Sequence, residues 1–80
     1  MTDMQKQAII AVYNAAVHDQ ASAEEGMDNA TNDKSWQRHA DKHSFALGKQ
    51  SAIDRMLSIL GYDLIVDDEK FAVDIQSHID

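Results

Sequence analysis

The chain has 80 residues and contains no cysteine, no proline and only three glycines. Without cysteine it can form neither disulfide bonds nor thiolate metal sites, and this absence fits a reducing compartment. Without proline, and with little glycine, long regular elements are favoured over irregular loops. The sequence therefore predicts a few long helices or strands and no disulfide-stabilised scaffold.

Long apolar runs are also missing. No segment approaches the roughly 20 apolar residues that a membrane-spanning helix needs, and the first residues lack the basic-then-apolar order of a signal peptide. We therefore expect a cytoplasmic protein that does not enter a membrane. A chain of 80 residues forms one domain, residues 1–80, and buries only roughly 60% of its unfolded surface. Such a small core favours a homodimer or a higher assembly.

Residue patterns of known catalytic sites are missing from the sequence as well. It contains no glycine-rich phosphate loop, no cysteine nucleophile and no serine in an elbow motif. Ser44 follows His43 directly, but neighbours in sequence do not face each other on a helix. We therefore expect no enzymatic activity and no bound cofactor.

The charged residues that are present are sorted into blocks. Residues 7–33 carry five acids and no base, residues 34–60 five bases and two acids, and residues 61–80 six acids and one base. Such sorting suits a chain that folds back on itself, and it also suits binding of a charged partner. The net charge of −7 disfavours nonspecific attraction to nucleic acid or anionic lipid.

Residues 3–30 are predicted to form the first helix. Thr2 and Gln5 fit a capping box, in which each side chain bonds an exposed backbone donor of the other residue. One stripe of side chains then repeats at alternating steps of four and three: Ile9, Tyr13, Ala16, Gln20, Ala23, Met27 and Ala30. Gly26 can either end this helix or lie inside it, and we favour the longer helix because the stripe continues past it.

Residues 34–60 are predicted to form the second helix, which Gly61 ends. Its start has three possible caps: Asn32, Asp33 or Ser35. Its stripe keeps the same rhythm: Trp36, His39, His43, Ala46, Gln50, Ile53, Leu57 and Leu60. A turn near residue 31 makes the helices antiparallel and brings Gln20 opposite His43, where the two polar side chains can bond each other.

Residues 62–76 change to a period of two and are predicted to form a β-hairpin with a loop at 67–70. A lone hairpin is marginal in water, so its apolar face must be covered. The second helix has a second apolar face, which can take either the hairpin or a second subunit: Ala52, Met56 and Ile59. We expect an α+β fold, an antiparallel helical hairpin followed by a β-hairpin packed on the second helix. We assign the second apolar face to a dimer interface.

The histidines are the candidate metal ligands. His39 and His43 stand four residues apart on one helix face, and His18 can reach them across the helical hairpin as a third nitrogen ligand. The zinc-protease pattern would place Glu after the first histidine, but Ala40 follows it. Both histidines also lie on the apolar stripe, where partly buried structural histidines are common. We therefore predict no metal site.

Four bases of the second helix fall within an arc of about 80° and form a basic strip: Lys34, Arg38, Lys42 and Lys49. With Phe45 in its middle, this strip can contact phosphates and stack on a base. Its bases can instead pair with the acids at the end of the first helix. Four bases are few and the flanking acids repel phosphates, so we favour internal pairing. Phe45 then indicates burial against a protein partner or a second subunit.

Acidic residues gather on the predicted β-hairpin and its loop. They can mimic spaced phosphates toward a nucleic-acid-binding protein, or they can keep the hairpin solvated and prevent edge-to-edge aggregation. The loop lacks the spaced Asp/Asn-Gly pattern of a calcium site. We predict one set of partner-contact residues on the acidic surfaces and the second helix: Glu24, Glu25, Asp28, Phe45, Asp67, Asp68 and Glu69.

Residues 48–62, which end in Leu60-Gly61-Tyr62, resemble small proteins of phages and prophages of Gram-positive bacteria. In those proteins a long helix ends in a Leu-Gly-Tyr turn and a short strand follows. Small acidic proteins of that origin often bind and block host machinery, including CRISPR effectors. The resemblance therefore implies an inhibitor of a host nucleic-acid-handling or defence protein. The alternatives are a self-associating structural or adaptor module, and a nucleic-acid binder that uses the basic strip.

Overall fold

The computed structural model describes residues 1–78, which form two helices followed by two strands. Helices α1 (Asp3–Asp28) and α2 (Asp33–Ile59) are antiparallel, and strands β1 (Tyr62–Val66) and β2 (Ala72–Ser77) form an antiparallel pair. The predicted α+β fold is therefore confirmed.

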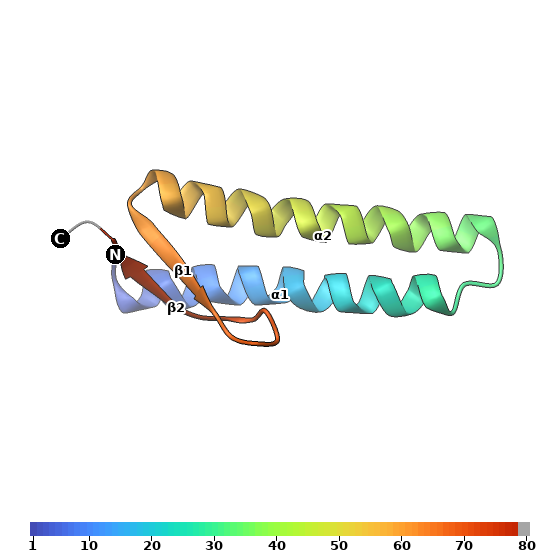
Figure 1. The fold of residues 1–80 in the computed structure, drawn as a ribbon, viewed down its shortest axis with the longest axis horizontal. Helices are drawn as coiled ribbons and strands as arrows, with labels where there is room; N and C mark the ends of the chain where they lie inside the picture. The colour runs from blue at the N-terminus through green and yellow to red at the C-terminus, as the bar shows by residue number, and fades with distance from the viewer. Residues whose placement is uncertain (79–80) are drawn as a thin grey trace.

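The two hairpins overlap over only part of their length. Figure 1 shows the β-hairpin across the half of the helical hairpin that holds the N-terminus, while the other half extends beyond it. We call these the proximal half (residues 3–17 and 47–59) and the distal half (residues 18–28 and 33–46). The molecule is accordingly elongated, with extents of 52 × 20 × 19 Å.

The ends of α1 follow from local hydrogen bonds. The capping box is confirmed, because Thr2 Oγ1 accepts from the Gln5 backbone N–H at 3.1 Å and Gln5 Oε1 accepts from the Thr2 N–H at 2.9 Å. The helix continues through Gly26 as predicted, but it ends at Asp28, two residues before Ala30. The Asn29 and Ala30 N–H groups close its last turn on backbone carbonyls.

Helix α2 begins and ends within one residue of its predicted bounds. Of the three possible caps, Asn32 is the one used, since its side chain accepts from the Ser35 backbone N–H at 2.8 Å. Gly61 follows the helix with a φ of 90°, a left-handed conformation that glycine adopts without steric cost. The predicted stop at Gly61 is therefore confirmed.

The loop of the β-hairpin spans residues 67–71, one residue more than predicted, and Asp67 holds it together. The Asp67 carboxylate accepts from the backbone N–H groups of Glu69 at 2.9 Å and Phe71 at 3.0 Å. Lys70 takes a φ of 72°, and the strand register shifts between Ile65 and Val66. A residue with positive φ beside a bulge is typical of short hairpin connections.

Asn14 attaches the β-hairpin to α1. Its side-chain amide donates to the Ala72 carbonyl at 3.0 Å and its Oδ1 accepts from the Ala72 N–H. This side chain therefore bonds the backbone of β2 as a neighbouring strand would. Strand β1 contacts α2 while β2 contacts α1. The predicted packing on the second helix is thus confirmed and extends to the first.

The core is small and rich in alanine. Seven apolar side chains are buried within residues 1–78: Ala16, Val17, Ala23, Ala46, Leu57, Ala72 and Ile75. Alanines on both helices let the backbones approach closely, so the predicted stripes do form the interface between α1 and α2. The stripe of α2 is not buried at its ends, where Trp36 and Leu60 are 48% and 63% exposed.

We predict that Asn14→Ala lowers the free energy of unfolding by about 2 kcal/mol, because two partly buried hydrogen bonds are lost at about 1 kcal/mol each. Gln37→Ala is the control, since Gln37 is exposed and its side chain, among residues 1–78, bonds only Asp41 on the surface of α2. That variant should stay within about 0.5 kcal/mol of the parent. Urea unfolding followed by circular dichroism measures both values. Equal losses in the two variants would contradict the role given to Asn14.

Candidate interaction surfaces

The three histidines considered as metal ligands do not meet. His43 Nε2 lies 3.0 Å from Glu24 Oε1, whereas the His39 ring rests against Gly26 so closely that a Cβ atom there would overlap it. His18 is exposed on α1. Within residues 1–78, no group of three or more His, Cys, Asp or Glu side chains is arranged to hold a metal ion.

A polar ladder joins α1 and α2 where the proximal and distal halves meet and continues into the distal half. Gln50 Nε2 donates to Gln20 Oε1 at 2.9 Å and to the Ala16 carbonyl at 3.3 Å. The prediction that Gln20 faces His43 is therefore wrong, because His43 lies opposite Glu24, one turn further along α1. The close contact of Gly26 with His39 and the small alanine side chains set this register, which a turn position alone does not specify.

Glu24 belongs to this ladder and is only partly available to a partner. Its carboxylate accepts hydrogen bonds from His43 and from Gln20, and these bonds lower the pKa of Glu24 below its usual 4.5. Glu25 and Asp28, which were predicted with it, are exposed. Their side chains make no hydrogen bond or ion pair within residues 1–78.

The three acids of the hairpin loop also differ in role. Asp67 is a structural residue, because its carboxylate caps two backbone N–H groups of the loop. Asp68 and Glu69 are exposed, and in the described part of the chain their side chains have no bonding partner. A test of the acidic surface must therefore change Asp68 and Glu69 and leave Asp67 in place.

The bases of the basic strip do not pair with the acids of α1. Among the described residues, the ion pairs within 4.0 Å are His43–Glu24 and His78–Asp63, and neither involves a lysine or an arginine. The expected internal pairing of the charge blocks is therefore wrong at the level of direct contacts. Long surface side chains gain little from fixed pairing in water, since the entropy lost in ordering them offsets the attraction.

Phe45 lies beside an open groove between the distal parts of the two helices. Its side chain is 66% exposed, and the Lys49 ammonium lies 4.6 Å from the centre of its ring. The groove has a volume of about 320 Å³ and is lined by both helices: Asp19, Ser22, Ala23, His39, Lys42, Phe45, Ala46 and Lys49. We call it the Phe45 groove. It combines one aromatic ring with charges of both signs.

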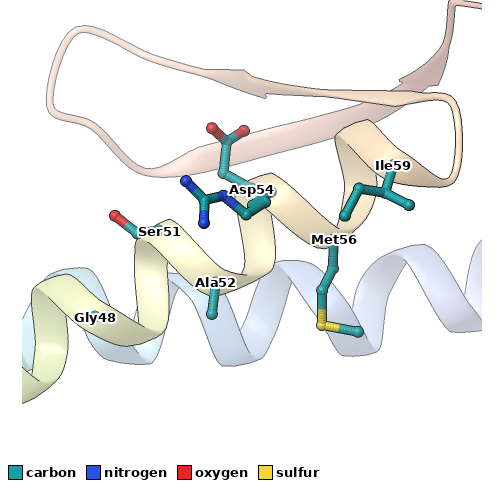
Figure 2. A pocket seen from close by; sticks show the side chains of 7 residues that line it. Gly48, Ser51, Ala52, Asp54, Met56 and Ile59 are labelled. Carbon is teal, nitrogen blue, oxygen red and sulfur yellow. The ribbon is translucent and has the colours of Figure 1, made fainter.

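The outer face of α2 carries the residues assigned to a dimer interface. Met56 and Ile59 are 62% and 78% exposed, and Ala52 is exposed beside them. Figure 2 shows Ala52 and Met56 on the side of α2 that points away from the β-hairpin, whereas Ser51 and Asp54 point toward it. The β-hairpin thus uses a different side of α2, and the predicted interface is left uncovered.

A second apolar surface was not predicted from the sequence. Shallow grooves between the proximal parts of α1 and α2 are lined by Ala8, Ile9, Val12, Ile53, Met56, Leu57 and Leu60. Val12 is 56% exposed although it is large and apolar. Val12 follows Ile9 by three residues and so widens the apolar stripe of α1 on one side. That spacing was the sequence signal for this surface.

Neither helix in the described part of the chain is both long and apolar enough to cross a membrane. Comparisons with models of protein families, with curated proteins and with solved structures found no match for this chain.

The bond between Glu24 and His43 predicts a pH dependence. Because the folded state lowers the pKa of Glu24 below 4.5, the ionised carboxylate stabilises the fold above that pH. This contribution disappears as the pH falls through the lowered pKa. Glu24→Gln should therefore melt at a lower temperature than the parent at about pH 6, and the difference should vanish once the pH falls below the lowered pKa of Glu24.

Thermal unfolding followed by circular dichroism at a series of pH values measures this difference. Glu25→Gln is the matched control, since the neighbouring carboxylate makes no bond within residues 1–78. If the gap between Glu24→Gln and the parent stays constant over this pH range, the ionised carboxylate does not stabilise the helix pair.

Proposed function

We propose that this protein is not an enzyme and acts by binding another protein through the distal half of its helical hairpin. The observation that carries the proposal is Phe45, a large aromatic side chain that is 66% exposed at the rim of a groove. Aromatic side chains in such positions supply much of the binding energy of protein interfaces. The β-hairpin does not extend over the distal half, so a partner can reach this groove without contacting the β-hairpin (Figure 1).

The charges around Phe45 support a protein as the partner. Lys42 and Lys49 line the groove together with Asp19, so a bound segment can satisfy charges of both signs around an apolar side chain. The carboxylates of Glu25, Asp28, Asp68 and Glu69, which have no bonding partner within residues 1–78, lie outside the groove. With a net charge of −7, they would speed the approach of a basic partner more than they would hold it.

The resemblance of residues 48–62 to small phage and prophage proteins supports a narrower form of this proposal. In that form the protein is an inhibitor of a host nucleic-acid-handling or defence protein. Such targets carry basic surfaces for nucleic acid, which suits the acidic charge of this chain. Inhibition then requires only that the bound protein covers the target's own binding surface.

The decisive variant is Phe45→Ala. Partners are first captured from the native host with the intact chain and identified by mass spectrometry, and the purified partner is then titrated by calorimetry. Removal of the ring should weaken binding by about 2 kcal/mol, or roughly 30-fold in Kd. Leu47→Ala is the control, because Leu47 is an exposed apolar residue two positions away on α2. Equal affinities of the parent and Phe45→Ala would remove the basis of the proposal.

The free carboxylates call for a separate measurement. Replacing Asp68 with Asn and Glu69 with Gln removes two charges and leaves the Asp67 cap of the loop intact. We expect a lower association rate with the captured partner and a smaller dependence of that rate on salt. Stopped-flow mixing at two ionic strengths measures both. An unchanged salt dependence would show that the loop does not steer the encounter.

One observation favours a second candidate function, binding of single-stranded nucleic acid. Phe45 lies between Lys42 and Lys49, and an aromatic ring flanked by bases can stack on a nucleobase. Titration of a labelled oligonucleotide tests this alternative, which requires an affinity that falls steeply with salt. Loss of that affinity in Phe45→Ala would favour nucleic acid over a protein partner.

A further inference from the structure

The proximal half of the helical hairpin has one face that the β-hairpin leaves open. We call it the proximal apolar face, and it consists of the six groove-lining residues that are not buried: Ala8, Ile9, Val12, Ile53, Met56 and Leu60. Three of these side chains, Val12, Met56 and Leu60, are 56%, 62% and 63% exposed. The face contains no charged residue, although the chain has a net charge of −7.

This face lies opposite the β-hairpin on both helices. On α1, Asn14 bonds β2, and Val12 is about 160° away from it around the helix. On α2, Asp54 points toward the β-hairpin and Met56 points away from it, as Figure 2 shows. The helix pair is therefore one layer that the β-hairpin covers on one side only.

The surface area of the chain indicates how much of its surface a partner could bury. A monomeric protein of 8.9 kDa exposes roughly 4800 Å² by the general relation between mass and surface. This chain exposes 5771 Å², which is an excess of about 1000 Å² over that value. A stable dimer buries roughly 800 Å² on each partner. The excess thus matches one ordinary dimer interface.

We propose that a second copy of this chain covers the proximal apolar face in a two-fold symmetric dimer. A two-fold interface brings the same patch of each subunit together, so a patch without charge lets two acidic chains meet without like-charge repulsion. The proximal apolar face meets that requirement, and it adds large side chains to a core whose buried residues are mostly alanines. The four helices form a central layer between two β-hairpins, and the distal halves point apart.

This arrangement revises the predicted interface and is independent of the Phe45 groove. Met56 belongs to both the predicted interface and the proximal apolar face, whereas Ala52 and Ile59 lie at its margin on the outer side of α2. The other half of the interface comes from α1, through Ile9 and Val12. The distal grooves stay open in the dimer, so each subunit keeps its surface for a partner.

Analytical ultracentrifugation of the full chain from about 1 to about 500 µM tests the proposal, because the mass of a reversible dimer depends on concentration. We expect twice the chain mass at the upper end. The double variant Val12→Glu with Met56→Glu should raise the dimer Kd by about 100-fold or more, since each charge enters a two-fold interface twice. Leu47→Glu and Val73→Glu change exposed apolar positions outside the proximal apolar face. These two variants should leave the dimer Kd unchanged.

A cysteine cross-link provides a readout that does not depend on destabilising substitutions. The chain has no cysteine, so Met56→Cys and Leu47→Cys each introduce a single thiol. Oxidation should link Met56→Cys into a dimer and leave Leu47→Cys monomeric. A parent chain that is monomeric at the highest concentration, or a double variant that dimerises as tightly as the parent, would overturn the proposal. If the monomeric double variant still binds the captured partner, then the Phe45 groove works without the dimer. The two proposals can therefore fail independently of each other.

Discussion

The close approach of α1 and α2 along small side chains is the constraint on which the rest of the structure depends. Ala16, Ala23 and Ala46 are almost completely buried between the helices, and Gly26 leaves room for the ring of His39. Such a contact gains little from the hydrophobic effect, because each alanine removes only a small apolar area from water. Hydrogen bonds such as Gln20–Gln50 and Glu24–His43 supplement it.

An interface built from small residues leaves the large apolar side chains to other surfaces. Ile75 and Leu57 are buried where the β-hairpin meets the helices, while Val12, Phe45 and Met56 remain exposed. The protein thus has a thin core and keeps several large apolar side chains on its surface. In the dimer and the partner complex that we propose, these exposed side chains become buried. They then stabilise the protein as a thicker core stabilises a larger domain.

The elements of the fold could be predicted because they depend on neighbours in sequence. The capping box at Thr2, the cap at Asn32 and the stop at Gly61 each involve residues no more than four positions apart. The period of two predicts the strands for the same reason. The register of the helix pair could not be predicted in this way, so Gln20 was given the wrong partner. The roles of Asp67 and Asn14 were missed, since an Asp or Asn in a sequence does not reveal which backbone groups it bonds.

The sequence by itself determined the order and type of the helices and strands, their bounds to within two residues, and the separation of charge along the chain. Only the tertiary structure decided which face of the helix pair the β-hairpin covers, because that choice rests on the bonds between Asn14 and Ala72, 58 positions apart. The tertiary structure also decided which charges are paired and which apolar residues remain exposed. The pairing of charges and the exposure of apolar residues both follow from the register of the two packed helices. Contacts between residues far apart in the sequence set that register.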